Sequence, residues 1–497
     1  MPGKSVNRDV HLAVDLGAES GRIIAGQLSG ELLSLQEVHR FPNVPQRIEG
    51  HLHWDIEVLF EEICKGLAKA GRLFGKNVRT VGVDSWGIDY GLLDREGNLL
   101  KQPFCYRDNR TDEVIDEVFE IIPRDELYKK TGIQIMSLNT VFQLAAELKS
   151  PDTSLEKADR LLFIPDLLNY WLCGVSRTEY TIASTSQLMD MRNGDWCISL
   201  IENLSIPSEI FSRPILPGTK LGPLKPKIGE ASGLEGVDII AVAGHDTGSA
   251  VAAIPAENER FAYLSSGTWS LLGIELKNAL ITEKTFEYNI TNEGGVSRTI
   301  RTLKNISGMW LVQECRRQWE QEGENYSYAD LTDMASRATP LTALIDPDSI
   351  DFIKPEFMPE RIWKYCLDRG HDISKDKGRT IRTILESLAM KYRYILEQLE
   401  EVSQTTLDPI HIVGGGAQNR LLNQFTADVT GKKVLSGPVE ATALGNLIMQ
   451  LVAMGKISGL KEGRQLIRKS FPPETFLPAV TDAWDSPYAN FCNLVGR

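Results

Sequence analysis

The sequence lacks the residue patterns that mark disulfide-stabilised and zinc-binding proteins. Its 497 residues include seven cysteines, none of them in a CxxC pair, and seven histidines without an HxxxH spacing. An odd number of cysteines scattered this widely favours buried thiols in a reducing compartment over disulfides or a zinc site.

Long apolar runs and low-complexity tracts are also missing. No stretch of about 18 apolar residues occurs, so the sequence predicts no transmembrane helix. The apolar run near residue 10 is too short for a signal peptide, and we expect a cytoplasmic protein. A net charge of -13 and a pI near 5.2 argue against nucleic acid and membranes as partners. They do not exclude ATP, because a few local donors and a metal ion decide nucleotide binding.

Alternating strand and helix signals indicate an α/β protein with two domains. The chain exceeds the roughly 250–300 residues at which a single hydrophobic core stops growing. Apolar residues at helical spacing after Asp55 predict a helix with an aspartate cap, and short apolar runs predict strands. In the first half, strands are predicted at 10–15, 22–28, 31–38, 80–84 and 237–243, a hairpin at 88–97 and a loop at 214–226.

A second strand–turn–strand unit begins near residue 260 and repeats the arrangement of residues 10–28 with different residues. Two such hairpins, one opening each half of the chain, would suit a two-sided phosphate clamp. The tail from 456 to 497 is expected to pack against one domain. In this half, strands are predicted at 261–265, 270–275, 409–413 and 433–435, and helices at 379–402, 418–429 and 441–454.

The motif DLGAESGR, residues 15–22, is the first candidate phosphate-binding turn. Gly17 and Gly21 allow the backbone to approach a ligand closely, and successive N–H groups in such a turn can hold phosphate oxygens. Ser20 and Arg22 add side-chain donors, and Asp15 could hold Mg²⁺ directly or through water. The alternative is a plain hairpin with polar turn residues. No GKS or GKT follows, so this is not a Walker A loop.

The motif GHDT, residues 244–247, places Asp246 at the end of an apolar strand, where α/β sheets bind ligands. A carboxylate there can accept the proton of an attacking hydroxyl, a task that a small-molecule kinase must give to some base. The alternative is that Asp246 caps the helix predicted after it.

Two further glycine motifs are candidates for nucleotide binding. SSGTWS, residues 265–270, supplies Gly267 and Thr268 at the second hairpin turn. The run Gly414–Gly416 follows a predicted strand and precedes a helix, which suits a nucleotide phosphate beside bare backbone. Three adjacent glycines cost more conformational entropy than a plain turn requires. The alternative for both motifs is a tight turn without a ligand.

Several polar or aromatic residues could shape an acceptor pocket, although each is individually more typical of a loop or a core. They are Trp86, Gly87, Arg107, Asp108, Asn139, Thr140 and Asn305.

Taken in order, these segments resemble the FGGY family of carbohydrate kinases from about residue 10 to residue 454. The similarity is carried by DLGAESGR, GHD, SSGTWS and VGGGAQNRLLNQFTADVTGKKV, and by VDSWGIDYGLLD, CYRDNRT, LNTVFQL, IPDLLNYWL, EYTIASTSQLMDM and KNISGMWLVQECRRQW. The last set resembles most the members that act on L-rhamnulose.

The resemblance implies two ribonuclease H-like domains of the actin-like ATPase superfold with an interdomain cleft. It implies an N-terminal kinase domain at 8–253, a C-terminal nucleotide-binding domain at 254–456 and a tail at 457–497 packed on one of them. The expected reaction of L-rhamnose catabolism transfers phosphate from MgATP to the C1 hydroxyl of L-rhamnulose, with Asp246 as the base. ATP and a small ketose are thus the expected partners.

The same resemblance implies specific binding residues. The Mg²⁺ ligand would be Asp15. ATP would contact Ala18, Glu19, Ser20, Gly21, Arg22, Thr268, Gln313, Gly414, Gly415 and Gly416. The sugar would contact Gly87, His245, Asp246, Thr247 and Asn305.

One residue departs from the family pattern. Glu19 puts a carboxylate in the first phosphate turn, where a small polar residue is more usual, and its charge would weaken ATP binding unless it points outward or helps to hold Mg²⁺. Alternatives to the expected reaction are the same chemistry on L-fuculose, L-ribulose, D-xylulose or glycerol, and a nucleotide-driven switch on the same superfold.

Overall fold

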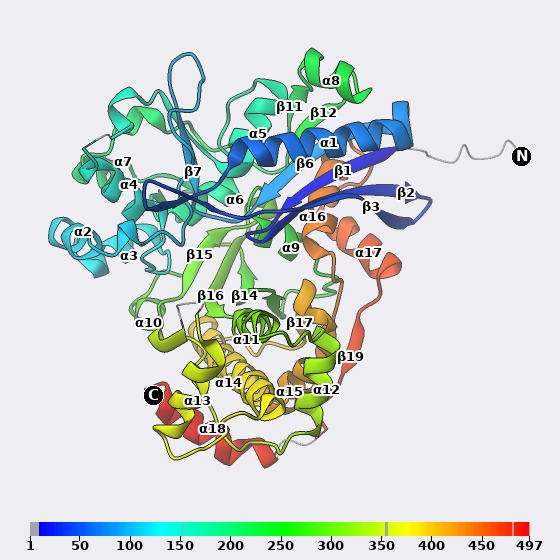
Figure 1. Cartoon of the computed structure of the whole chain (residues 1–497). Coiled ribbons are helices and arrows are strands. Elements are labelled where there is room, and N and C mark those ends of the chain that lie inside the picture. Colours follow the sequence, from blue (N-terminus) through cyan, green and yellow to red (C-terminus); the bar gives the residue numbers. More distant parts are fainter. Residues whose placement is uncertain (1–8, 152, 353–355, 480–481, 497) are drawn as a thin grey trace, which may run out of the picture. The chain divides into compact units, whose positions relative to one another are not determined.

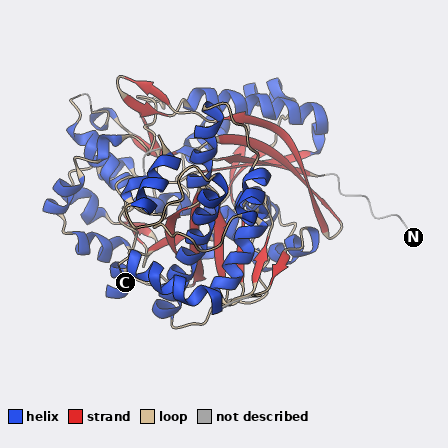
Figure 2. Ribbon diagram, turned by 60° about the horizontal axis from the view of Figure 1, so that its bottom comes forward, coloured by secondary structure: helices blue, strands red, loops and turns tan. Residues whose placement is uncertain are grey.

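The computed structural model describes residues 9–151, 153–352, 356–479 and 482–496, so the predicted outer boundaries 8 and 497 lie outside it. Helices and strands alternate along the chain (Figures 1 and 2), which confirms the predicted α/β class. The chain forms two compact units. Of the described residues, the first contains those within 9–255, 275–302 and 441–471, and the second contains those within 256–274, 303–440 and 472–496. Among the helices of the described residues, none combines the length with the hydropathy that a membrane-spanning segment needs.

The first unit is built on a six-stranded sheet of order β11-β12-β6-β1-β2-β3. Its central strand β1 pairs antiparallel with β2 and parallel with β6, and the register sets Asp15 beside both Arg22 and Asp84. The strands are β1 (Val10–Leu16), β2 (Ser20–Ser29), β3 (Leu32–Pro42), β6 (Val78–Ser85), β11 (Thr219–Pro223) and β12 (Asp238–Ala241). Polar side chains from three strands therefore gather at one end of the sheet.

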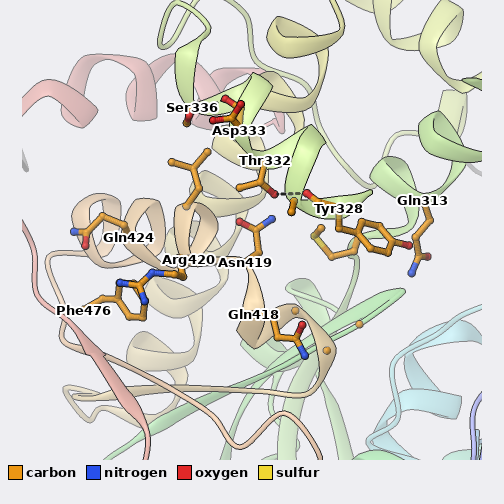
Figure 3. Close-up of a pocket in the computed structure, with 16 residues that line it drawn as sticks. Gln313, Tyr328, Thr332, Asp333, Ser336, Gln418, Asn419, Arg420, Gln424 and Phe476 are labelled. Carbon is orange, nitrogen blue, oxygen red and sulfur yellow. Dashed lines mark hydrogen bonds between the residues drawn. The ribbon is translucent and has the colours of Figure 1, made fainter. Parts of the chain in front are cut away.

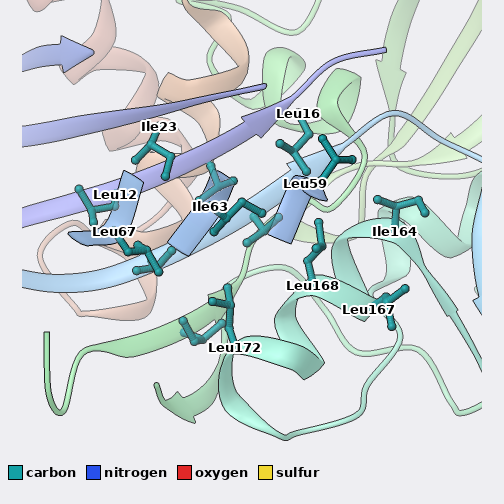
Figure 4. Close-up of a cluster of buried hydrophobic side chains, with 14 of the residues drawn as sticks. Leu12, Leu16, Ile23, Leu59, Ile63, Leu67, Ile164, Leu167, Leu168 and Leu172 are labelled. Atoms are coloured by element: carbon teal, nitrogen blue, oxygen red, sulfur yellow. The ribbon is translucent and has the colours of Figure 1, made fainter. Parts of the chain in front are cut away.

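Helix α1 (Ile56–Phe74) covers one face of this sheet, as predicted from its apolar spacing. Asp55 caps it by accepting a hydrogen bond from the backbone N–H of Val58 at 3.0 Å. Its apolar face packs with strand residues such as Leu12 and with helix α5 (Ile164–Cys173) in one buried cluster (Figure 4). Each fully buried leucine or isoleucine contributes about 1.5–3 kcal/mol, so this cluster holds the sheet rigid behind the polar strand ends.

Two segments distant in sequence complete the first unit. Helix α16 (Ala441–Ala453) packs against β1, β6 and the short helix α9 (Asp246–Ala252). On α17 (Leu460–Ser470), the Ser470 hydroxyl accepts a hydrogen bond from the N–H of Leu33 at 2.8 Å. The compact units therefore cut across the predicted divisions at 254 and 457, because these helices bury their apolar faces on the first sheet.

The second unit contains a sheet of order β16-β14-β13-β17-β18-β19. Strand β17 lies parallel to β13 and to β18, while β13 and β14 form the predicted antiparallel hairpin. The strands are β13 (Ala262–Ser266), β14 (Trp269–Leu276), β16 (Ile300–Ser307), β17 (Ile410–Val413), β18 (Val434–Ser436) and β19 (Glu474–Phe476), and the main helices are α11 (Trp310–Gln321), α12 (Tyr328–Arg337), α13 (Met358–Leu367), α14 (Lys377–Ser403), α15 (Arg420–Thr430) and α18 (Asp482–Leu494).

The remaining elements are short. They are β4 (Gln46–Ile48), β5 (His51–His53), β7 (Tyr90–Leu93), β8 (Arg160–Phe163), β9 (Met189–Asp190), β10 (Asp195–Trp196), β15 (Thr291–Gly294), α2 (Ile115–Ile121), α3 (Arg124–Thr131), α4 (Thr140–Lys149), α6 (Tyr180–Ala183), α7 (Ile198–Asn203), α8 (Pro226–Ser232) and α10 (Glu283–Glu287).

Two local predictions need correction. The predicted hairpin at 88–97 closes over its turn, with an antiparallel bridge between Leu93 and Leu99 and a hydrogen bond from the N–H of Leu100 to the carbonyl of Leu92 at 2.9 Å, but the main partner of β7 is the distant strand β8. The predicted loop at 214–226 contains β11, an edge strand that pairs with β12 alone. Edge strands tolerate the proline and glycine residues that suggested a loop, because one side of the strand needs no ladder partner.

Candidate active site

The first phosphate motif forms a tight turn between β1 and β2. Asp15 is the penultimate residue of β1, and its Oδ2 accepts hydrogen bonds from Nε and Nη2 of Arg22 at 3.0 and 2.8 Å. The N–H of Gly17 donates to the carbonyl of Ser20 at 2.9 Å. Gly21 is required here, because a Cβ at this position would lie 2.4 Å from the ring of Phe41. The conformation of the turn is thus fixed by contacts between the two strands that it connects.

The side chains in this turn differ in exposure. Ala18, Ser20 and Arg22 are half-buried, whereas Glu19 is exposed. A loop residue fixes the turn from outside, since Asn43 donates its amide to the carbonyl of Gly17 at 2.9 Å and its backbone N–H to the carbonyl of Glu19 at 3.0 Å. Of these side chains, that of Glu19 is the one most open to solvent, and solvent and salt screen an exposed charge.

Asp246 lies at the carboxyl end of β12 and is the first residue of α9. The residue before it, His245, occupies the cap position, so the capping alternative for Asp246 does not hold. Its Oδ1 accepts hydrogen bonds from the N–H and the hydroxyl of Thr247 at 2.5 and 3.1 Å. The side chain is 31% exposed, so an acceptor can reach the carboxylate. Burial of the carboxyl, the dominant effect, raises its pKa, although the neighbouring His245 opposes this.

A third aspartate, which the sequence reasoning missed, lies beside Asp15 and Asp246. Asp84 is the penultimate residue of β6 and is fully buried. Its Oδ2 accepts a hydrogen bond from the amide of Asn446 at 2.5 Å, while Oδ1 is buried without a hydrogen-bond partner. Burial and then the charge of Asp15 raise the pKa of Asp84 well above its ordinary value. Its only sequence signal was its place at the end of a predicted strand.

Two buried carboxylates behind the GHDT turn were also missed. Glu179 Oε2 accepts a hydrogen bond from the N–H of Gly244 at 2.8 Å, and it also binds the hydroxyl of Thr181, whose oxygen accepts from the N–H of His245 at 3.2 Å. Burial raises the pKa of Glu179 to about 7 against the effect of these donors. Asp166 accepts the N–H of Glu179 with both oxygens at 3.2 Å. The backbone of the GHDT turn is therefore fixed by hydrogen bonds to the buried side chains of Glu179 and Thr181.

Several residues predicted to shape an acceptor pocket serve the core instead. Trp86 is buried against Trp54 and donates its indole N–H to Asp89 at 2.9 Å. Asp108 accepts the N–H of Leu52 at 2.7 Å. Buried Asn139 donates to Gln187 Oε1 and to the carbonyl of Gln134, and Thr140 donates to the carbonyl of Ile88. An indole platform for a sugar at Trp86 is therefore wrong.

Gly87 lies two residues after the end of β6 and is half-buried, and a Cβ there would lie 3.2 Å from Thr185. The first unit thus holds Asp15, the turn from Ala18 to Arg22, Gly87 and the residues His245–Thr247. The second unit holds Asn305, Thr268, Gln313 and the run Gly414–Gly416. Asn305 is half-buried on β16.

The second unit contains a pocket of about 890 Å³ beside the glycine run. Gln313 of α11 and Gly415 and Gly416 of the turn line it, as predicted, whereas Thr268 and Gly414 are not among its lining residues. Helix α12 forms the wall that the sequence reasoning missed (Figure 3). The lining residues are Gly267, Met309, Gln313, Tyr328, Ala329, Thr332, Asp333, Ser336, Gly415, Gly416, Gln418, Asn419, Arg420, Leu421, Gln424 and Phe476.

The glycine run packs against the turn of the first hairpin of this unit. Gly414 has φ 84°, in the left-handed region, and a Cβ on Gly416 would lie 2.0 Å from Oγ of Ser266. The helix predicted at 418–429 begins only at Arg420, after a 3₁₀ turn, and Asn419 caps it by accepting the N–H of Leu422 at 3.0 Å. Bare backbone therefore faces the pocket, in a form that suits a nucleotide.

The chain matches both domains of one family. The N-terminal domain of the FGGY family of carbohydrate kinases matches residues 10–253, and the C-terminal domain matches residues 262–454. The chain is 45% identical over 483 residues to the rhamnulokinase of Bacteroides thetaiotaomicron, covering 97% of this chain and 99% of that protein. It is 41% identical to the rhamnulokinase of Bacillus subtilis, covering 95% and 96% of the two.

Solved structures confirm the predicted two-domain α/β fold. The ligand-bound xylulose kinase from Lactobacillus acidophilus matches with a TM-score of 0.79 at 14% identity, covering 98% of this chain and 96% of that one. The glycerol kinase of Plasmodium falciparum with ADP matches with a TM-score of 0.78 at 16% identity, covering 98% and 97%. At such low identity these likenesses concern the fold alone. The two matched domains and the identity to these relatives over nearly the whole length show that the chain is an ATP-using carbohydrate kinase of the FGGY family.

Proposed function

We propose that this protein transfers the γ-phosphoryl group of ATP to the C1 hydroxyl of L-rhamnulose and yields L-rhamnulose 1-phosphate. The main support for this proposal is that the chain is 39–45% identical to relatives named rhamnulokinase over at least 94% of its length. The same reaction on another ketose or on a polyol is the alternative.

In the proposed mechanism, Asp246 is the general base. Thr247 donates twice to Oδ1, so Oδ2 accepts the proton of the C1 hydroxyl. The resulting oxygen forms a bond to the γ-phosphorus, the bond from that phosphorus to the bridging oxygen breaks, and ADP leaves with the electron pair. General-base assistance of this kind contributes about 10²–10⁴-fold to the rate.

The remaining residues of the proposed site divide between sugar and nucleotide. Gly87, His245, Thr247 and Asn305 are assigned to the sugar. Ala18, Glu19, Ser20, Gly21, Arg22, Thr268 and Gly414 are assigned to the phosphates, and Gln313, Gly415 and Gly416 to the nucleotide in the pocket that they line. Glu19 takes part through its backbone, because its side chain is exposed.

The donor set fits Mg²⁺ held together with the phosphates of ATP. No three His, Cys, Asp or Glu side chains of the described chain lie so as to surround a metal ion. Mg²⁺ usually takes one or two carboxylates and completes its shell with phosphates and water. Asp15, at the phosphate turn, is the proposed ligand. When bound there, the ion would neutralise charge on the phosphates.

The substrate assignment predicts a clear sugar preference. With MgATP, L-rhamnulose should give the highest kcat/KM in coupled ADP release, compared with L-fuculose, L-ribulose, D-xylulose, glycerol and no sugar. A site built for one pattern of hydroxyls leaves polar groups unpaired with the wrong sugar. A preference for another sugar would overturn the substrate but keep the base, whereas equal ADP release without sugar would overturn both.

The nucleotide assignment predicts the effect of Gly415→Ala. A Cβ at Gly415 meets no protein atom within 4 Å, so the fold should be unaffected and Tm unchanged. A nucleotide lying against this backbone would be displaced, and we expect KM for ATP to rise about tenfold, which corresponds to about 1.4 kcal/mol. KM for the sugar should not change. An unaltered KM for ATP would show that the nucleotide does not lie against Gly415.

A further inference from the structure

A buried ion pair lies directly behind the imidazole of His245, within the first unit. Arg301 on β16 is fully buried, and its Nη2 lies 3.1 Å from Oε2 of Glu293 on β15. Arg301 also donates from Nε to the carbonyl of Gly294 at 2.9 Å, which fixes the plane of the guanidinium. Burial alone would raise the pKa of Glu293, but the charge of Arg301 and the contact with His245 hold it below its ordinary value.

The guanidinium determines which nitrogen of His245 carries the proton. Nη2 of Arg301 lies 2.9 Å from Nδ1 of His245. A guanidinium nitrogen can only donate, so in this contact Nδ1 accepts and its lone pair points at Arg301. Oε2 of Glu293 lies farther from Nδ1, at 3.3 Å, and would be the acceptor for the opposite tautomer. The imidazole proton of the neutral ring is therefore on Nε2. A doubly protonated ring would place two N–H donors face to face at this distance.

The protonated nitrogen faces the proposed base. Nε2 of His245 lies 3.4 Å from Oδ1 of Asp246, the oxygen that Thr247 already holds. An N–H on Nε2 of His245 favours the ionised form of the Asp246 carboxylate. It also holds Oδ1 on the side of His245 and Thr247, which leaves Oδ2 for the substrate. The opposite tautomer would put a nitrogen lone pair against the carboxylate.

Stability does not account for this arrangement. A buried ion pair is often no more stable than apolar side chains of similar volume, because desolvation offsets the attraction of the charges. Nη1 of Arg301 and Oε2 of Glu293 are moreover buried without a geometrically complete hydrogen bond. The shortest side-chain contact of Arg301 in this cluster is the one between its Nη2 and Nδ1 of His245, at 2.9 Å. His245 is the residue next to the proposed base.

We propose that Arg301 and Glu293 are positioning residues: Arg301 fixes His245 in the Nε2–H tautomer, and Glu293 holds Arg301 in place, so that the N–H of His245 orients the carboxylate of Asp246. The proposal rests on the role of Asp246 in the proposed function, and its first test is independent of activity.

The test is the ¹⁵N chemical shifts of the histidine ring in protein labelled only at histidine, recorded without substrates. The sequence holds seven histidines, so the resonances of His245 can be assigned by comparison with His245→Gln. Wild type should show a protonated Nε2 and a bare Nδ1 for His245. In Arg301→Met, Oε2 of Glu293 remains 3.3 Å from Nδ1 and should draw the proton there.

Kinetics complete the test. Arg301→Met should lower kcat more than tenfold with KM for ATP unchanged, because only the orientation of the base is lost. Glu293→Gln keeps the arginine donor and should cost only a few-fold in kcat with the Nε2–H tautomer retained. If Arg301→Met fails to fold because a charge is left alone, Arg301→Met/Glu293→Met removes both charges. Without either group beside Nδ1 the ring should lose its fixed orientation, and kcat should still fall more than tenfold.

Two results would overturn the proposal: a wild-type His245 protonated at Nδ1, or an Arg301 variant that folds and keeps both the wild-type tautomer and the wild-type kcat. Failure of L-rhamnulose in the sugar comparison, by contrast, leaves the tautomer result intact and affects only the substrate.

Discussion

Replacing Asp246 by asparagine should lower kcat for sugar phosphorylation by about 10²–10⁴-fold. The amide has nearly the shape of the carboxylate, and its oxygen can still accept from Thr247 at the position of Oδ1. It cannot take a proton from the acceptor hydroxyl. KM for ATP should stay near the wild-type value, because Asp246 contacts no phosphate in the proposed arrangement. The measurement is steady-state ADP release at saturating sugar and ATP.

A matched control for this variant lies on the strand that leads to the turn. Asp238, at the start of β12, pairs with the exposed Lys220 at 2.6 Å. Surface ion pairs of this kind contribute about 0–1 kcal/mol, so Asp238→Asn should change kcat by less than twofold. A turnover of Asp246→Asn close to that of this control would show that the reaction uses another base.

The local structure around the site could be predicted from the sequence because its determinants are local. Alternating apolar residues define β1 and β2, and an aspartate before an apolar helical pattern gives the cap of α1. Glycine turns are equally local: Gly21 and Gly416 stand where a Cβ would collide with Phe41 and Ser266. Strand ends and glycine turns are the features that drew attention to Asp246 and to the pocket.

The parts that could not be predicted depend on residues far apart in the chain. Asn446 donates to Asp84 across 362 positions, and Glu179 supports Gly244 across 65. Neither pair has a spacing or a motif that links its members. The wall formed by α12 was missed for the same reason, since an amphipathic helix does not reveal which face lines a pocket. Trp86 is likewise buried because its ring packs against that of Trp54, and no pattern in the sequence links these two positions.

Helix α16 illustrates how such distant packing reaches the proposed base. It crosses α9 at Gly445, where a Cβ would lie 1.7 Å from the carbonyl oxygen of Ser249 and 2.5 Å from its carbon. Both atoms are backbone, so the overlap cannot be relieved by a change of rotamer. The helices approach this closely only because position 445 has no side chain. Since α9 begins at Asp246, any displacement of α9 also moves the carboxylate.

Gly445→Ala should therefore reduce both stability and turnover. Overpacking of a rigid core typically costs about 1–3 kcal/mol and occasionally more, and the contact with backbone places this variant at the upper end. This loss of stability should outweigh the roughly 1 kcal/mol by which alanine is favoured over glycine inside a helix. A shift of about 1 Å in a catalytic group can cost about 10²-fold in rate, so kcat should fall at least tenfold.

The matched control is Gly463→Ala in α17, which has the same gain in helix propensity. There a Cβ would meet the side chain of Ile448, with Cγ2 at 2.6 Å, and not a backbone atom. Ile448 is buried and must give way, so Tm should fall, but by less than in Gly445→Ala, because a side chain can shift where a carbonyl cannot. The displaced group is not the backbone of α9, so kcat should stay close to wild type. Thermal unfolding and steady-state kinetics of both variants measure the two effects. Equal behaviour of the two alanines would mean that α9 and α16 can separate without moving Asp246, and that the base is held by Glu179 and Thr181 from the other side alone.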